Sequence, residues 1–489
     1  MTNIKQLCKL SILTLLITCY NCSSFLEQEP GSQTSITEQL SSFEGIVTAL
    51  NGAYSSLEEN VRGERFAVYA DLQSGNITFT PTETGSNIGQ ITPARNLENI
   101  YHFTDLATES DFSSFYNSSY DIINQSNLIL EYVETLTNIS ETERNQIKAE
   151  ALTIRAYAHF LLVNVYAQHY SFTTNASHTG IVYNKTTLTN GITYPARETV
   201  KNTYAFIIDD LINALDYYSD FVLLNGPTYS YFNKTNTQAL LARVYIYKGD
   251  WQNAYDAANN VILNSGITLT PSENYISEWE KPDLPISEIL LEFSIPRDTG
   301  GNVGGSMSSF FGFTSTSNYA DYVASVDLIN LYETNDLRSQ LFLEENLSTL
   351  VDSELENVPY NFTKKFQDNP GYVGIRLSEM YLIRAEASLG LELFEDCKND
   401  INIIRNRANA TLLDSTDNLE TALLLERRKE LCFEGQYLFD LARNKKDLIK
   451  NQGCISTTCT LNYPSGKYIL PIPESNLDLN ENLTQNDTY

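Results

Sequence analysis

The chain has 489 residues, of which 61 are Asp or Glu and 32 are Lys or Arg, so its formal net charge at pH 7 is −29. This excess of acid argues against nucleic-acid binding, which depends on neutralising phosphates with Lys and Arg, and against electrostatic attachment to a membrane. The length is sufficient to bury a large hydrophobic core.

The first 18 residues have the layout of a secretory signal peptide. Lys5 and Lys9 give a basic start, and an apolar run follows from Leu10 to Ile17. This run is too short to span a bilayer, which takes about 20 apolar residues, and no later segment of the sequence is longer and equally apolar. We therefore expect a protein that is exported without a membrane-spanning helix.

Two cysteines, Cys19 and Cys22, follow directly after the apolar run. A thioredoxin-like pair needs a strand before it and a helix after it, whereas this pair precedes a polar segment that extends to residue 40. The residues up to Cys19 read L-I-T-C, which resembles a bacterial lipobox, in which the cysteine is lipidated and becomes the new N-terminus. Cys22 is the alternative, although Tyr20 and Asn21 are poor residues before a cleavage site. Residues 19–40 are then interpreted as a tether.

Helical periodicity begins at residue 43 and recurs over 111–136, 141–168 and 199–218. The segment 141–168 is apolar nearly all round from Ala149 onward, which predicts a buried helix. Two later stretches, 239–262 and 381–404, resemble each other: each is a helix, a Gly-containing turn, and an aromatic residue three positions before a small one. This is the pattern of tetratricopeptide-type hairpins, in which the aromatic fills a gap between helices. The predicted fold is mainly α, with a tetratricopeptide-like helical hairpin scaffold, long irregular insertions and a few short strands.

Two irregular regions, 71–110 and 266–372, interrupt the helical pattern and are rich in Gly, Thr, Asn and aromatic residues. Long irregular excursions within a compact domain are often functional. Sugar rings stack their C–H faces on flat aromatic side chains and need polar groups near their hydroxyls. We expect the two regions to meet on one face, and the candidate ligand-binding residues in them are Phe79, Arg95, Asn96, Tyr101, Phe103, Trp279, Phe311, Asn318 and Tyr319.

No catalytic or metal-binding motif stands out. Glu426, Glu430 and Glu434 recur at i, i+4 among basic residues, which is typical of a solvated or salt-bridged helix face rather than of a catalytic pair. The four histidines have no metal-ligand spacing, and His159 is expected to be a core residue. Catalytic residues, metal ligands and cofactors are therefore not predicted.

The remaining cysteines divide into two groups. Cys397 and Cys432 fall on apolar helix faces and are expected to be inert core thiols. Cys454 and Cys459 flank a polar loop, and the sequence leaves open whether they form a disulfide, because their separation says nothing about geometry.

Five segments, taken in order, resemble the SusD/RagB family of surface lipoproteins. They are CSSFLEQEP, AEALTIRAYAHFLLVNVYA, IRLSEMYLIRAEASLG with INIIRNRAN, LLERRKELCFEGQYLFDLAR, and the closing LPIPESNLDLNENLTQNDTY. The resemblance covers nearly the whole mature chain. Two features depart from the family pattern: Gln436 and Tyr437 replace a His-Arg pair, and only 2 Trp residues are available for stacking.

The resemblance implies a lipid-anchored protein on the outer face of the outer membrane. It would capture a glycan or oligosaccharide and pass it to a SusC-like TonB-dependent barrel without catalysis. A RagB-like peptide-binding protein is the alternative, favoured by the low Trp count, and a secreted hydrolase is a more distant one. The implied organisation is a signal peptide (1–18), a tether (19–40), an N-terminal region (41–275) and a C-terminal region (276–489), the last two intertwined in one globular unit.

Overall fold

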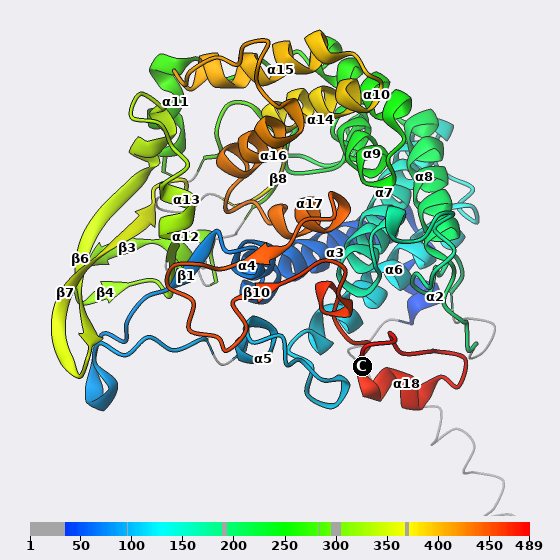
Figure 1. The fold of residues 1–489 in the computed structure, drawn as a ribbon. Coiled ribbons are helices and arrows are strands. Elements are labelled where there is room, and N and C mark those ends of the chain that lie inside the picture. The colour runs from blue at the N-terminus through cyan, green and yellow to red at the C-terminus, as the bar shows by residue number, and fades with distance from the viewer. Residues whose placement is uncertain (1–34, 95, 188–192, 283, 295–304, 367–370) are drawn as a thin grey trace, which may run out of the picture.

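The computed structural model is mainly helical, with 50% helix and 11% strand (Figure 1), as predicted. The structure describes residues 35–94, 96–187, 193–282, 284–294, 305–366 and 371–489. The predicted signal peptide, Cys19, Cys22 and most of the predicted tether lie outside the described residues. None of the helices in the described part of the chain is both long and apolar enough to cross a membrane.

The described elements are helices of 4 to 26 residues and strands of 2 to 10 residues. The helices are α2 (Ile36–Gln39), α3 (Phe43–Arg62), α4 (Glu64–Gln73), α5 (Glu98–Tyr101), α6 (Ser113–Val133), α7 (Glu141–Tyr166), α8 (Val200–Tyr217), α9 (Lys234–Lys248), α10 (Trp251–Asn264), α11 (Ser272–Trp279), α12 (Met307–Phe311), α13 (Val326–Ile329), α14 (Leu377–Gly390), α15 (Phe394–Arg407), α16 (Leu419–Glu430), α17 (Tyr437–Arg443) and α18 (Glu474–Leu479). The strands are β1 (Ile77–Phe79), β2 (Ile289–Phe293), β3 (Phe313–Ser315), β4 (Asn318–Tyr319), β5 (Tyr322–Ala324), β6 (Phe342–Val351), β7 (Glu354–Thr363), β8 (Tyr372–Arg376), β9 (Leu448–Ile449) and β10 (Thr460–Leu461).

The long helix α7 is buried along most of its length, as its continuous apolar sequence predicts. It begins at a capping box, in which the Ser140 hydroxyl accepts from the Glu143 N–H and the Glu143 carboxylate accepts from the Ser140 N–H. Its C-terminal carbonyls are bonded by the end of the chain: the Leu470 N–H donates to the Val165 oxygen at 2.9 Å. His159, on the same helix, is fully buried and bonded to the Arg155 carbonyl, which confirms its prediction as a core residue.

The two predicted hairpins are α9–α10 and α14–α15, and they lie side by side in the arc of helices in Figure 1. Gly249 ends α9 with a φ of 74°, a left-handed conformation that glycine adopts without strain. Gly390 serves another purpose: a Cβ there would lie 2.4 Å from the Trp251 ring, so its bare backbone lets the second hairpin approach the first. Trp251 is half-buried, packed against the main core.

The second hairpin departs from the prediction at its aromatic position. Phe394 was expected to fill a gap between helices, but 54% of it is exposed. The helix α15 packs chiefly on α14, and the Phe394 side of α15 is left facing solvent. Cys397, three residues later, is fully buried as a free thiol, as is Cys432 elsewhere in the core, which confirms both as core thiols.

A four-stranded sheet of order β1-β5-β7-β6 stands at the edge of the molecule away from the helical arc (Figure 1). The pairing of β1 with β5 is antiparallel and sets Ile77 opposite Ala324 and Phe79 opposite Tyr322. A separate pair, β2 with β8, connects the segment after α11 to the start of α14. Strand β1, from the first half of the chain, therefore joins a sheet whose other strands come from the second half.

Candidate ligand-binding face

The two irregular regions meet along the pairing of β1 with β5, which confirms that they lie together. Beyond the strands, the Thr80 N–H donates to the Asp321 carbonyl at 3.0 Å and the Thr80 hydroxyl donates to the Ala320 carbonyl at 2.9 Å. The Tyr319 N–H donates to the Glu83 carboxylate at 2.6 Å. The residues after β1 and those before β5 thus form one continuous surface.

A hollow of 510 Å³ opens at this meeting point, lined by residues 79–84, 92–94, 318, 319 and 321. Its polar groups are mainly acceptors and hydroxyls, contributed by Glu83, Asn318, Asp321 and several threonines. Tyr319 is half-buried: its hydroxyl donates to the Pro81 carbonyl at 2.9 Å, and its ring packs on Phe362. Burial together with the charges of Glu64 and Glu83 raises the pKa of Asp321. The hollow therefore has a negative electrostatic character.

Four of the predicted aromatic residues are not available to a ligand. Phe79, Tyr101, Trp279 and Phe311 were expected on the binding surface, but each is at most 3% exposed. Their rings pack against one another or against other core rings: the centroids of Phe79 and Tyr101 are 4.9 Å apart, and those of Phe311 and Phe433 are 5.0 Å apart. Regions with little helix build their core from such rings, and of the four only Phe79 borders the hollow.

The other predicted residues have different surroundings. Asn318 is exposed and, with Tyr319, lines the hollow. Phe103 is half-buried, with the Lys450 ammonium 4.2 Å from its ring centroid, and it lines neither this hollow nor the one described next. Arg95 lies outside the described residues.

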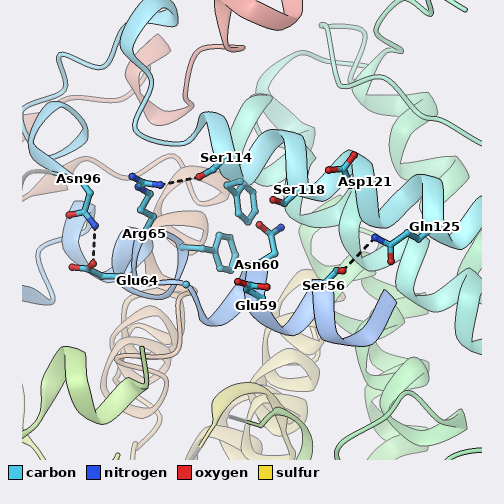
Figure 2. A pocket seen from close by; sticks show the side chains of 13 residues that line it. Ser56, Glu59, Asn60, Glu64, Arg65, Asn96, Ser114, Ser118, Asp121 and Gln125 are labelled. Carbon is cyan, nitrogen blue, oxygen red and sulfur yellow. Dashed lines mark hydrogen bonds between the residues drawn. The ribbon is translucent and has the colours of Figure 1, made fainter. Parts of the chain in front are cut away.

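A second hollow, of 490 Å³, lies between α3, α4 and α6 (Figure 2). Asn96, a predicted site residue, lines it and donates to the Glu64 carboxylate at 2.8 Å. The Arg65 guanidinium donates to the Ser114 hydroxyl at 3.0 Å, and Glu59 and Asp121 add carboxylates to the wall. These helical residues were not predicted as site residues, because charged positions on an amphipathic helix give no signal that separates a binding wall from an ordinary solvated face.

Glu64 connects the two hollows. One of its carboxylate oxygens accepts from the Tyr322 hydroxyl at 2.8 Å, and the other accepts from Asn96. The strand residue Tyr322 lies next to Asp321 of the first hollow, and the segment 92–94 that lines the first hollow runs on to Asn96 of the second. The two hollows are neighbouring parts of one polar face.

A disulfide joins Cys454 to Cys459 and closes a loop beneath this face, which answers the question that the sequence left open. The Ile455 N–H of this loop donates to the Tyr101 hydroxyl at 3.1 Å, and the Gly453 carbonyl accepts from the Thr78 hydroxyl at 3.1 Å. The loop therefore holds β1 and α5 from below, and it belongs to the support of the hollow rather than to its lining.

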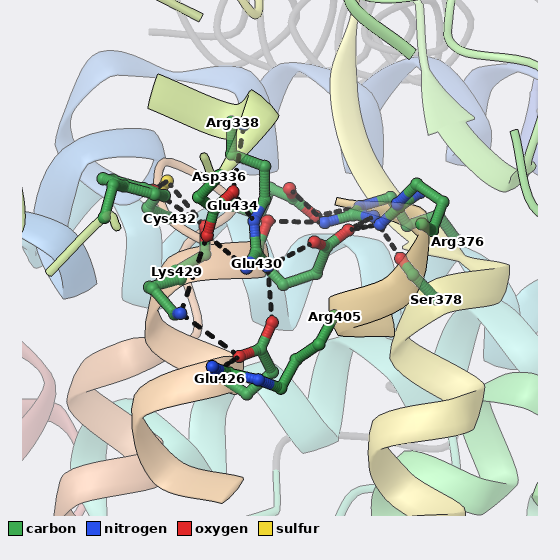
Figure 3. A network of polar contacts seen from close by, with 12 residues as sticks. Asp336, Arg338, Arg376, Ser378, Arg405, Glu426, Lys429, Glu430, Cys432 and Glu434 are labelled. Atoms are coloured by element: carbon green, nitrogen blue, oxygen red, sulfur yellow. Dashed lines mark hydrogen bonds and ion pairs between the residues drawn. The ribbon is translucent and has the colours of Figure 1, made fainter. Parts of the chain in front are cut away.

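The glutamates of the late signature are ion-paired in the protein interior (Figure 3). Glu430 accepts from Arg376 at 2.6 Å and from Arg407 at 2.5 Å, and Glu434 accepts from Arg376 and from Lys365, each at 2.9 Å. Burial alone would raise the pKa of Glu430, but Arg407, Arg376 and Arg338 outweigh it and hold the pKa well below its usual range. The prediction of a salt-bridged face is confirmed, whereas its solvated alternative is wrong because these side chains are fully enclosed. Carboxylates held ionised in this way, out of reach of a substrate, do not act as an acid–base pair.

The polar face consists of hydroxyls, amides and carboxylates, with Arg65 in the second hollow. Within the described ranges, no group of three or more His, Cys, Asp or Glu side chains is arranged to hold a metal ion. Such a surface can form many hydrogen bonds to a ligand that is rich in hydroxyl groups.

Comparison with known proteins gives matches at both ends of the chain. Residues 24–246 match a family model described as "Starch-binding associating with outer membrane", and residues 350–489 match the model of the SusD family. SusD-like protein P2 of Formosa agariphila is 22% identical over 98% of this chain and 99% of its own length. Starch-binding protein SusD of Bacteroides thetaiotaomicron is 37% identical over a shorter stretch, 23% of this chain and 21% of its own.

Solved structures share the same fold. The crystal structure of a putative sugar binding protein from Bacteroides vulgatus superposes with a TM-score of 0.76 at 27% identity, covering 91% of this chain and 98% of that one. A SusD superfamily protein from Bacteroides thetaiotaomicron gives a TM-score of 0.75 at 26% identity, covering 91% of this chain and 99% of that one.

Proposed function

This chain belongs to the SusD/RagB family, and from that premise we propose that it captures a neutral glycan at the cell surface, in the hollow of the polar face where the two irregular regions meet. Proteins of this family are binding proteins rather than enzymes. The ligand is therefore released chemically unchanged. Relatives named for starch or sugar binding support a carbohydrate as the ligand class.

The observation that carries the proposal is the acceptor-rich hollow at the junction of β1 and β5. Sugar hydroxyls donate well to carboxylates, and Glu83 and Asp321 lie in the lining beside the amide of Asn318. Tyr319 offers the one half-buried aromatic ring in that lining. Because none of the described lining residues of this hollow is Lys or Arg, and because the net charge is −29, a sulfated or uronic-acid glycan would be repelled.

A peptide ligand is the alternative, and one observation favours it. Four of the predicted aromatic residues are buried, so the described face lacks the broad stacking platform that an extended glycan would use. Carboxylates such as Glu59 and Asp121 would suit a basic peptide equally well.

Titrating the purified protein with neutral oligosaccharides, sulfated oligosaccharides and basic peptides separates these ligands. We expect binding only in the neutral glycan series, with the ligand recovered intact. Asp321→Asn and Asn318→Ala should each weaken it, whereas the exposed control Asp209→Asn on α8 should not. Binding only by peptides would favour the alternative, and binding that neither site variant changes would place the ligand on another surface.

We further propose that the protein is held at the outer membrane by a lipid on Cys19, or on Cys22 if cleavage occurs there, with residues up to 40 as a tether. Its partner would be a SusC-like TonB-dependent barrel that receives the glycan. The family description as outer-membrane-associated supports this placement. Mass spectrometry of the mature N-terminus should find a diacylglyceryl cysteine, and gentle solubilisation should recover the barrel with the lipoprotein. A mature chain starting after Pro30 without lipid, or a lipoprotein that always purifies alone, would contradict these two proposals respectively.

A further inference from the structure

A separate pocket of 360 Å³ lies among α7, the segment that joins α8 to α9, and β2, and its lining shares no residue with the polar face. Apolar and aromatic side chains make up much of its wall, and Asp220, Asn233 and Lys234 are among the polar residues that also line it. Tyr229, Tyr231 and Phe232 contribute rings, and Phe221 and Val222 at the rim are 36% and 73% exposed. Apolar side chains left in solvent around a concave site are unusual for a surface with no ligand.

The floor of this pocket carries a buried carboxylate, Glu150, which is only 2% exposed. Its two oxygens accept from neutral donors, the Tyr54 hydroxyl at 2.7 Å and the Gln146 amide at 2.8 Å. Within the described part of the chain, Glu150 forms no ion pair. The negative charge on the floor is therefore solvated by hydrogen bonds but is not neutralised.

Several other buried carboxylates in this protein are matched by an arginine, although Asp71, Asp105 and Glu292 are hydrogen-bonded to neutral donors, as Glu150 is. Asp210 pairs with Arg155 at 2.6 Å, and Glu379 pairs with Arg243 at 2.6 Å. Next to Glu150 there is instead a pocket. Enclosing the ionised carboxylate without a neighbouring cation is energetically unfavourable. Burial accordingly raises the pKa of Glu150 to about 7.

Gln146 supplies a second observation that points to a ligand. It also lines the pocket and is 5% exposed, yet its amide oxygen has no hydrogen-bond partner. Buried amide groups are almost always paired, so an unpaired acceptor beside an unneutralised carboxylate marks a place where a donor is missing. Both groups on the floor can accept a further hydrogen bond, and a positively charged donor would also neutralise the carboxylate.

We propose that this pocket binds a small organic ammonium ion carried on an apolar group. The ammonium would lie against Glu150 and Gln146, where its N–H groups meet the free acceptor and its charge neutralises the carboxylate. The tyrosine rings of the wall attract a cation to their faces, and the apolar rim covers the rest of the ligand.

The test compares 2-phenylethylammonium with its neutral isostere 2-phenylethanol by calorimetric titration of the mature protein at pH 8. We expect the ammonium to bind at least tenfold more tightly. Glu150→Gln keeps the shape and the acceptor of the Tyr54 hydrogen bond but removes the charge, so it should abolish this preference. Equal affinity for the two probes, or a preference that Glu150→Gln leaves unchanged, would overturn the proposal.

A second pair of variants keeps the test decisive if Glu150→Gln fails to fold. Tyr229→Leu removes a half-buried wall ring and should weaken ammonium binding several-fold, whereas Tyr255→Leu, on α10 outside the pocket, should leave it unchanged. Equal effects of the two would count against the site. Phenylalanyl-glycyl-glycine amide and its N-acetylated form then distinguish the source: binding by the free peptide supports the site with a peptide terminus as ligand, and binding by 2-phenylethylammonium alone supports it with a free amine.

Discussion

Replacing Tyr101 by Ala is expected to unfold the binding face rather than merely to remove a contact with the ligand. The ring is 2% exposed, lies edge-on to Phe79 at 4.9 Å and has the Lys450 ammonium 4.1 Å from its centroid. Truncating a buried aromatic costs about 3–5 kcal/mol of unfolding free energy. The Tyr101 hydroxyl also accepts from the Ile455 N–H, and an unpaired N–H adds roughly 1 kcal/mol. The Lys450 ammonium retains its bond to the Tyr101 carbonyl, so the ring accounts for most of the loss.

Urea unfolding of three variants measures these contributions. Tyr101→Ala should lower the unfolding free energy by about 3–5 kcal/mol, and Tyr101→Phe by roughly 1 kcal/mol, since only the hydroxyl is lost. Tyr319→Ala, at a half-buried position, should lower the unfolding free energy by less than Tyr101→Ala does, and it should weaken glycan binding by removing a ring that lines the hollow. If Tyr101→Ala cost less than about 1 kcal/mol and abolished glycan binding, the ring would be available to the ligand and the argument from burial would be wrong.

Three further variants test the interior. Arg376→Met removes the guanidinium from three buried carboxylates and should lower the unfolding free energy, measured by urea titration, by about 3–5 kcal/mol. Lys446→Met, at an exposed ion pair, should lower it by less than about 1 kcal/mol. Similar values for the two variants would refute the role of the buried network. The pKa of Glu150 is raised from 4.5 to about 7, so its ionisation destabilises the folded state by roughly 3 kcal/mol above pH 7 and has no effect in acid. The melting temperature of Glu150→Gln should therefore rise relative to that of the wild type as the pH increases from 5 to 8. A difference between the two that does not vary with pH would contradict this. Gly390→Ala places a Cβ 2.4 Å from the Trp251 ring, so it should lower the unfolding free energy by roughly 1–3 kcal/mol, and with it the melting temperature, although Ala has the better helix propensity. Unchanged stability would mean that the ring moves aside freely.

The helical scaffold could be predicted because its signal is local. The apolar residues of α7 and the repeated pattern of the two hairpins depend on neighbours within a few turns. The signature glutamates show the limit of such reasoning. Their partners Arg376 and Arg407 come from other elements, and a sequence pattern alone cannot tell a face that is paired in the interior from one that is paired in solvent.

The polar face was harder to predict, because it too depends on contacts between segments that are distant in the sequence. The aromatic residues without helical period were expected to be exposed, but Phe79 and Trp279 are core residues of regions that contain little helix. Whether an aromatic in an irregular segment faces solvent depends on which distant strand covers it, and the pairing of β1 with β5 joins segments far apart in the chain. Asn318 and Tyr319 line the hollow because they precede β5 at its junction with β1, and their role in binding stays a prediction.

The hydrogen bonds at the C-terminal end of α7 constrain the order in which this protein folds. The carbonyls of Val165 and Tyr166 accept from Leu470 and Asn486, which lie far later in the sequence. A chain threaded N-terminus first through a membrane would therefore display the long helix α7 with the Val165 carbonyl unpaired until Leu470 has emerged. Contacts over such long sequence separations form slowly and expose the intermediate to aggregation. Loss of residues 470–489 should thus impair maturation, although none of them lines the polar face.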